Sequence, residues 1–290
     1  MKFNKSPFTI SQQISHIKTK FKCHNSDKLE KYLLHYNYYR LRGYWLFFEE
    51  IDVNIEFNEV ISLYNFDSEL RTLFLKYIEK IEISIKSIFA YHLTTKYNNS
   101  HIHLDKTIFL NEEFYNNSIF HLQNSFNSSK ELFAKHFKNY NEILPPLWAS
   151  VEIMTFGEIS KWYSNLNIKD RKEISIYYNI SQKSLYTFLI HLTEVRNLCA
   201  HHNRLWNKRI LKSFSIPKKF NIIVYNQKFK IYHTAIMMDY ILNFLDNNRF
   251  FDEFIELIIK YQIPLKYMGF KKEHNIEKLN NINYEYKREI

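Results

Sequence analysis

The side chains best suited to chemistry lie in one short run, Arg196-Asn197-Leu-Cys-Ala-His201-His202. A histidine titrates near neutral pH and can take the proton from a ribose 2'-hydroxyl. An arginine stays charged and matches phosphate oxygens in a fork. The run therefore contains the residue types for RNA cleavage without a metal ion, and we take Arg196, Asn197, His201 and His202 as the candidate catalytic residues.

The spacing of this run raises a geometric difficulty. His201 is five positions after Arg196, so a regular helix places them about 140° apart. Three arrangements would resolve this: the helix loosens near Ala200, His202 substitutes for His201, or a second subunit supplies the matching half. Asn197 and His201, four residues apart, share a face and could orient one another.

A long helix is expected to carry the motif, capped by Ser181 and extending to Cys199. Arg196 falls in the middle of its main apolar stripe, where a charge needs a partner. Glu82 is the predicted partner, because it falls on the apolar stripe of another helix. The alternative interpretation is structural: the polar residues around Arg196 only end a core helix, and Arg196 forms an ion pair with a carboxylate.

The composition excludes several function classes. Only three glycines occur among 290 residues, so neither a GxxxxGK phosphate loop nor a GxGxxG dinucleotide turn can form. Two distant cysteines give neither a disulfide framework nor a zinc signature, which fits a reducing cytoplasm. We expect no membrane segment, no cofactor and no metal. His101 and His103, with Asp105 nearby, are expected to be solvated in an Asn-rich loop.

Helical periodicity and few turn residues predict an all-α fold. Expected helices include two within residues 8–40, one over 59–97 that Asp67 could restart as a cap, and one over 120–140. Further helices are expected after Pro145-Pro146, up to about Leu166 with a separation at Gly157, and over 235–245 and 250–261. Residues 98–118 are predicted to form a loop. Residues 220–232 could pair as a short β-hairpin.

The net charge of +10 and the pI near 9.2 favour a nucleic-acid partner, although base bias in the genome could produce the same composition. An aromatic and basic segment, Tyr38 to Trp45, lies at an expected glycine break and suits base stacking and phosphate contact. A packed helix junction with snorkelling arginines would look the same. The candidate RNA-binding residues are Tyr39, Arg40, Arg42, Arg204, Lys208 and Arg209.

These residues resemble a known family. Arg196-Asn197-x-x-x-His201 is similar to the signature of HEPN ribonucleases, and the wider pattern resembles the Abi-like abortive-infection proteins of the AbiD and AbiF group. The matching blocks span roughly residues 8–245: Tyr38-Tyr-Arg-Leu-Arg-Gly-Tyr44, Leu63-Tyr-Asn-Phe-Asp67-x-x-Leu-Arg71, Ile78-Glu-x-Ile-Glu82, Pro146-Leu-Trp148 and Arg196 to Trp206.

The resemblance implies a HEPN-like helical bundle, which we expect at 59–262 after N-terminal helices at 1–58. The charged, Asn-rich composition near the end predicts a flexible tail at 263–290, where no family pattern matches. It further implies a homodimer that brings two motifs together and cleavage that leaves a 2',3'-cyclic phosphate. Arg196 and His201 match the family's catalytic positions, and Asn197 its polar position. A small structured non-coding RNA is the implied antidote.

Three functions compete at this point. The leading hypothesis is an endoribonuclease toxin of anti-phage abortive infection, restrained by a cognate small RNA. The second is a non-catalytic RNA-binding protein whose motif is structural. The third is a protein-interaction scaffold that recruits a phage component through its aromatic surface.

Overall fold

The computed structural model describes residues 6–49, 55–217, 230–245 and 248–270, and these residues form helices and turns without a sheet. The all-α prediction is therefore confirmed. The α-helices are α1 (Ile10–Lys18), α2 (Ser26–Tyr36), α3 (Tyr38–Glu49), α4 (Phe57–Tyr97), α5 (Glu112–Ser128), α6 (Leu132–Phe137), α7 (Leu147–Ile153), α8 (Phe156–Asn165), α9 (Ile168–Ile176), α10 (Gln182–Ala200), α11 (Ile231–Leu242) and α12 (Phe250–Tyr261).

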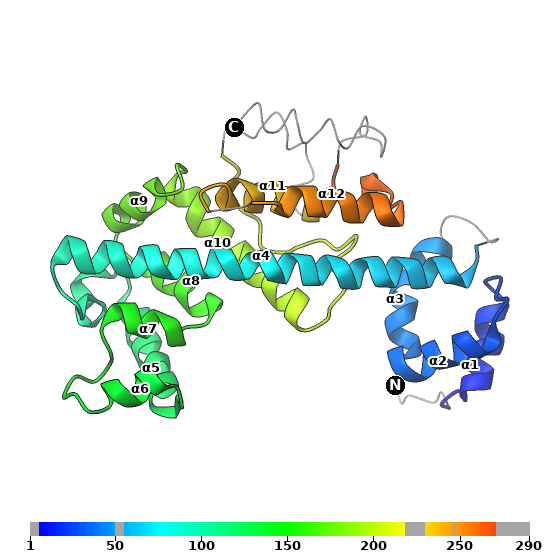
Figure 1. Ribbon diagram of the computed structural model, residues 1–290, viewed down its shortest axis with the longest axis horizontal. Helices are drawn as coiled ribbons and strands as arrows, with labels where there is room; N and C mark the ends of the chain where they lie inside the picture. Colours follow the sequence, from blue (N-terminus) through cyan, green and yellow to red (C-terminus); the bar gives the residue numbers. More distant parts are fainter. Residues whose placement is uncertain (1–5, 50–54, 218–229, 246–247, 271–290) are drawn as a thin grey trace.

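Helix α4 is the long axis of the molecule (Figure 1). Its 41 residues span about 60 Å at 1.5 Å per residue. Apolar side chains recur at steps of three and four and are buried along the whole length, so α4 packs against partners throughout. The helix ends at Asn98, which has the left-handed conformation (φ 46°) typical of a helix end. Asp67 does not cap a new helix, because α4 continues through this residue and the Asp67 side chain is fully buried.

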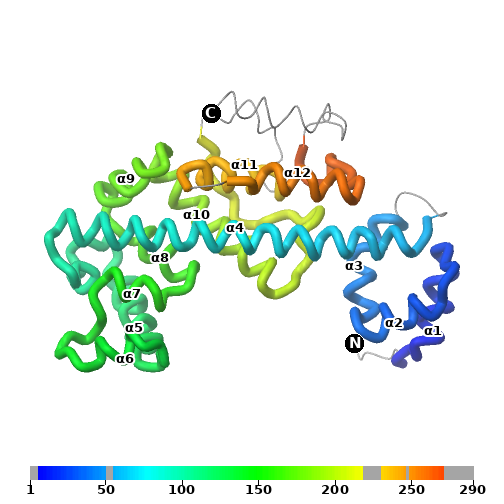
Figure 2. The backbone as a smooth tube through the Cα atoms, in the orientation of Figure 1, coloured from blue at the N-terminus to red at the C-terminus, as the bar shows by residue number. Residues whose placement is uncertain are grey.

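The other helices pack against successive parts of α4 (Figures 1 and 2). The α1–α3 group lies at its N-terminal end, whereas α7, α8 and α9 contact it toward its C-terminal end. Helices α11 and α12 run along one side, where Phe74 meets the rings of Phe250 and Phe254 at 5.3 and 6.0 Å. Helix α10 crosses α4 and also packs against α8 and α9, which makes the motif helix central.

The expected break at Gly43 is wrong. Helix α3 runs through this residue from Tyr38 to Glu49, and nothing lies within 4 Å of the Cβ that a larger residue would carry there. The break lies earlier, at Asn37, where a φ of 65° separates α2 from α3. Asparagine tolerates this left-handed conformation better than most residues, which explains why the chain turns at Asn37 rather than at Gly43.

Several predictions for the middle of the chain need correction. The predicted loop over 98–118 ends early, because the Asn111 side chain accepts a hydrogen bond from the Phe114 amide and starts α5 at Glu112. Gly157 lies inside α8; the separation is at Thr155, which caps that helix. His103 is buried rather than solvated, and hydrogen-bonds to Ser150 at 3.4 Å.

Toward the C-terminus, most of the possible hairpin at 220–232 lies outside the described residues, and Ile231 and Tyr232 begin α11. Residues 263–270, at the start of the predicted tail, are packed, with Met268 fully buried. Within the described ranges, no helix is both long enough and apolar enough to cross a membrane.

Candidate active site

The motif lies where α10 ends. Ser181 caps the start of the helix, as expected, by accepting a hydrogen bond from the Ser184 amide at 3.0 Å. At the other end the amides of His202 and Asn203 donate to the carbonyls of Cys199 and Leu198 at 3.0 and 2.9 Å. This is a Schellman motif with His202 in the left-handed position (φ 56°) that glycine usually takes. The helix is therefore closed directly after His201.

The motif side chains reach the surface. Arg196 is partly exposed, whereas Asn197, His201 and His202 are exposed. Asn197 and His201 line one hollow of about 420 Å³ between α8, α10 and residues 211–212, and Arg196 is not part of its lining. Because the His201 amide still donates to the Asn197 carbonyl at 3.0 Å, the helix does not loosen before His201. Within one chain, Arg196 and His201 thus remain on different sides of α10.

Arg196 has no carboxylate partner in the described part of the chain. Among the described residues, the hydrogen bond of its side chain runs from Nη1 to Oδ1 of the adjacent Asn197, at a weak 3.4 Å. The predicted pairing with Glu82 is wrong, because Glu82 instead forms an ion pair with Lys86 one helical turn later, at 2.9 Å. The Arg196 guanidinium is consequently left with donors that an anion could occupy.

A buried cluster holds the turn that follows the motif. We define the Asp67 cluster as the side chains of Tyr44, Asp67 and Arg71 together with the backbone amides of Leu205 and Trp206. The fully buried Asp67 carboxylate accepts from Tyr44 Oη at 2.6 Å and from Arg71 Nη1 at 2.5 Å. It also accepts from the Leu205 amide at 3.1 Å and the Trp206 amide at 2.5 Å. One carboxylate thereby connects α3, α4 and the chain beyond α10.

The electrostatics of the Asp67 cluster follow from its burial. Burial raises the pKa of the Asp67 carboxyl, and the four donors around it oppose that rise. Burial likewise raises the pKa of the Tyr44 hydroxyl well above its usual range, with the nearby Asp67 charge acting in the same direction. Because every donor is aimed at one carboxylate, the cluster fixes the position of residues 205 and 206.

Two arginines join the same turn to α3, one from each side of the contact. Arg40 donates to the carbonyl of His202 at 2.8 Å, and Arg204 donates to the carbonyl of Gly43. The aromatic and basic segment predicted to bind RNA therefore contacts the motif turn directly. Each guanidinium carries five N–H donors, so one bond to a carbonyl leaves others for phosphate.

The chain that follows the motif turn returns to α10 and is held there by Glu194 and His191. The Glu194 carboxylate accepts from the amides of Leu211 and Lys212 at 3.0 and 2.7 Å. His191 lies between the Lys212 carbonyl and the Thr234 hydroxyl, and burial lowers the pKa of its imidazole to about 4. A neutral His191 must donate through Nδ1 to the carbonyl and accept through Nε2. Residues 211–212 are thus held against the motif helix.

The remaining predicted RNA-binding residues lie on the surface around this turn. Tyr39 is 70% exposed, and the exposed Arg42 guanidinium lies 6.0 Å from its ring centre. Arg209 is exposed and Lys208 partly so. The fold therefore brings the two basic segments of the sequence, around residues 40 and 204, to one place.

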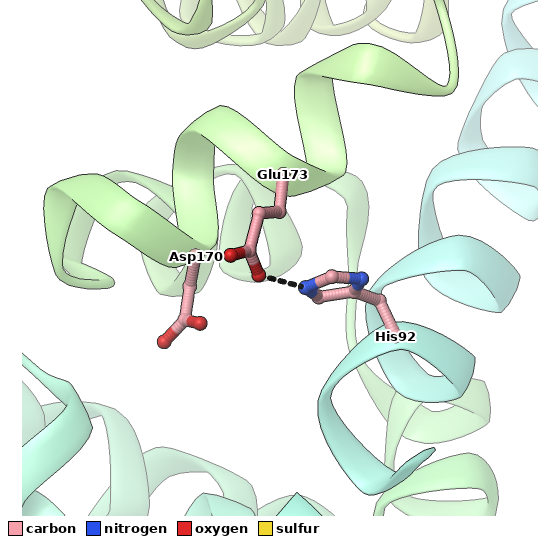
Figure 3. A group of neighbouring side chains, drawn as sticks. All are labelled: His92, Asp170 and Glu173. Carbon is pink, nitrogen blue, oxygen red and sulfur yellow. Dashed lines mark ion pairs between the residues drawn. The ribbon is translucent and has the colours of Figure 1, made fainter. Parts of the chain in front are cut away.

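A second group of titratable residues, His92, Asp170 and Glu173, has ligand atoms within 4.8 Å of one another (Figure 3). Lys96 Nζ lies 2.5 Å from Asp170 and 2.6 Å from Glu173, so one ammonium already forms an ion pair with each carboxylate. The hydrogen bond from Lys96 lowers the pKa of Glu173. We assign this group a structural role, joining the end of α4 to α9.

Sequence reasoning missed most of the supporting residues. Asp67 and Arg71 are four residues apart on an apolar stripe, and that spacing is the signal of a buried ion pair. No comparable signal marked Tyr44, Glu194 or His191, because their hydrogen-bond partners lie 17 or more residues away in the sequence.

A comparison with protein-family models matches residues 31–207 to the family described as Abi-like protein, which is more than half of the chain. The chain belongs to the Abi-like protein family. The match contains α3, all of α4, the motif and the entire Asp67 cluster, and it is shorter than the 8–245 span expected from the sequence blocks. Comparisons with curated proteins and with solved structures give no match. Family membership suggests a role in abortive-infection defence.

Proposed function

We propose that this Abi-like protein is a metal-independent endoribonuclease of the HEPN type, acting as a homodimer in anti-phage abortive infection. One observation carries the proposal: Arg196 reaches the surface at the same end of α10 as two exposed imidazoles and has no carboxylate partner among the described residues. Arginines with a structural use in this chain have a carboxylate or carbonyl partner, as Arg71 has Asp67 and Arg40 has the His202 carbonyl. A guanidinium without such a partner, near histidines at one helix end, instead suits an anionic substrate.

The chemistry follows from the residue types. His201, or His202, takes the proton of a ribose 2'-hydroxyl, and the 2'-oxygen attacks the adjacent phosphorus. Arg196 stabilises the charge that builds on the phosphate oxygens. The bond from phosphorus to the 5'-oxygen breaks, and the leaving oxygen takes a proton from an acid such as a second imidazole. The products are a 2',3'-cyclic phosphate and a 5'-hydroxyl.

A second copy of the chain would resolve the geometry of the site. Arg196 and His201 lie on different sides of α10 in one chain, whereas two copies related by a two-fold axis could place the Arg196 of one beside the His201 of the other. A site of this kind can be tested by mixing two inactive variants. Arg196→Ala and His201→Ala subunits, exchanged in equal amounts, should recover about a quarter of native activity if pairing is random.

The direct test measures RNA cleavage and toxicity for the native protein, Arg196→Ala and His201→Ala. Cleavage by the native protein should persist in EDTA and give 5'-hydroxyl ends that accept phosphate from a kinase without prior phosphatase treatment. His202→Ala tests the alternative imidazole. Equal cleavage by the native protein and all three variants would refute the site assignment.

The proposal includes a restraining partner, a small structured RNA bound to the basic surface near residues 40 and 204. The net charge of +10 and the exposed Arg42 and Tyr39 support it. Sequencing of the nucleic acid that co-purifies with the protein tests this part. One abundant structured RNA supports an antidote, whereas a random mixture opposes it.

The alternative, a non-catalytic RNA-binding protein, draws support from a specific observation: Arg40 and Arg204 each donate to a backbone carbonyl and so have a structural use. Under this alternative we expect an RNA affinity that falls as the salt concentration rises, and no cleavage products under any condition. The assays above separate the two functions.

A further inference from the structure

The hollow beside the motif, which we call the motif hollow, has a largely apolar lining. Ile190 and Leu198 come from α10, and the 76% exposed Leu211 comes from the segment that Glu194 holds in place. Asn197 and His201 are the motif residues that line it. An open apolar surface beside a candidate catalytic imidazole is suited to the flat face of a base.

A second hollow of about 410 Å³ lies between α5 and α8, and we call it the α5–α8 hollow. Its lining residues are Phe114, Asn117, Ser118, His121, Glu158, Lys161 and Trp162. Lys161 lines both hollows, so they adjoin at this side chain. Phe114 is 40% exposed and offers a ring edge or face to a ligand.

The charged groups left to contact a ligand around the two hollows are cationic. The oxygens of the two acidic lining residues are engaged by neutral donors: Glu194 accepts from two amides, and Glu158 accepts from the amide and hydroxyl of Thr155 in the α8 cap. In contrast, the ammonium groups of Lys161 and Lys212 are exposed and form no ion pair within the described part of the chain. These two ammonium groups are thus available to the phosphates of a ligand.

We propose that the motif hollow and the α5–α8 hollow together form the seat for the single-stranded RNA substrate, with phosphates at Lys161 and Lys212 and a base against Phe114. This inference rests on the proposed function and specifies the path of its substrate. The second copy of the proposed dimer meets this surface at His201, but a subunit that filled both hollows fits less well, because lysine is depleted from the centres of protein interfaces. Aromatic side chains combined with lysines are instead typical of single-strand binding.

Gly157 provides a way to block the seat without altering the motif. It lies in the first turn of α8 and lines the motif hollow, and an added Cβ would meet Thr193 Cγ2 at 3.5 Å, an ordinary contact. Gly157→Ala should therefore be tolerated and serve as the control, whereas Gly157→Phe should fill the hollow. Melting curves by circular dichroism establish that both variants are folded.

The experiment measures binding of a fluorescent 12-nucleotide single-stranded RNA in the Arg196→Ala background, where the RNA should stay intact. Loss of one phosphate contact should reduce the slope of log K against log salt by about 0.7, so Lys161→Gln and Lys212→Gln together should reduce it by about 1.4. Lys183→Gln, an exposed lysine in the first turn of α10, is the matched control. Gly157→Phe should weaken binding at least tenfold relative to Gly157→Ala.

The outcomes separate this inference from the proposed function. If the native protein cleaves RNA but the Lys161 and Lys212 variants bind like Lys183→Gln, the seat is refuted. If Gly157→Phe weakens dimerisation and leaves RNA affinity unchanged, the motif hollow is a subunit interface, and the seat is also refuted. If the native protein never cleaves RNA while binding depends on Lys161, the seat is supported and the nuclease proposal fails.

Discussion

Replacement of Asp67 by asparagine tests the idea that one carboxylate positions the motif turn. The substitution keeps the shape of the side chain but removes the charge that four donors share. It leaves Arg71, which is only 4% exposed, without a counter-charge. It also places amide hydrogens of the new side chain toward donors, among them the Trp206 amide.

The size of the effect can be worked out from these contacts. Removing one partner of a buried ion pair costs about 3–5 kcal/mol, because the other charge stays buried and unpaired. The lost bonds to the two amides lie within the same network and do not add independently. We therefore expect Asp67→Asn to lower the free energy of unfolding by about 3–5 kcal/mol, and Tyr44→Phe, which removes one donor, by about 1 kcal/mol.

Urea denaturation followed by tryptophan fluorescence measures the free energy of unfolding, and amide hydrogen exchange over residues 201–212 measures the local effect. Glu79→Gln, an exposed charge removal on the same helix, is the control and should change stability by less than about 0.5 kcal/mol. If Asp67→Asn stays within 1 kcal/mol of the native protein and exchange over 201–212 is unchanged, the role assigned to the Asp67 cluster is wrong.

Three further predictions concern stability. His202→Gly should raise the free energy of unfolding by about 0.5–1 kcal/mol in urea titrations, because glycine adopts the left-handed conformation of residue 202 without strain; a decrease would contradict the assigned helix end. Gly43→Ala should stabilise α3 by a similar ~0.5–1 kcal/mol in the same titrations, since a methyl group meets nothing there. His103 and His191 are held neutral, with pKa values lowered by burial to about 3 and about 4. As pH falls below about 6.5, these imidazoles take up a proton in the unfolded chain but stay neutral in the folded protein. The free energy of unfolding therefore decreases as pH falls from 6.5 toward 4, by up to about 1.4 kcal/mol per pH unit for each histidine; melting temperatures that stay level from pH 7 to 5 would contradict this.

The sequence predicted the helices best where a periodic pattern was long. The expected helix over 59–97 matches α4, and that over 250–261 matches α12, because many buried positions repeat at helical spacing. Predictions that rested on a single residue were weaker. Gly43 and Gly157 both lie inside helices, since glycine is only mildly unfavourable there and packing decides the outcome.

The candidate site was predicted in part, for a physical reason. The motif residues and the individual basic residues follow from local sequence. That the two basic segments meet was not predicted, because they are far apart in the sequence and only the fold joins them. Glu82 was wrongly predicted as the partner of Arg196: helical projection placed Glu82 on a buried stripe but gave no distance, and Glu82 pairs with Lys86 one turn away. Lys161 was missed because an isolated exposed lysine carries no local pattern; only the fold places it in the lining of the same hollow as His201.

The clamp between α3 and the motif turn affects how the protein can be divided. A fragment that begins at α4 would lose the Tyr44 hydroxyl and the Gly43 carbonyl, and with them the bonds to Asp67 and Arg204. It would also uncover the apolar surface that Leu41 and Trp45 bury. Deletion variants made to isolate a minimal folded unit that keeps the motif should therefore start upstream of Tyr38, because α3 and the motif end of α10 are a single mechanical assembly.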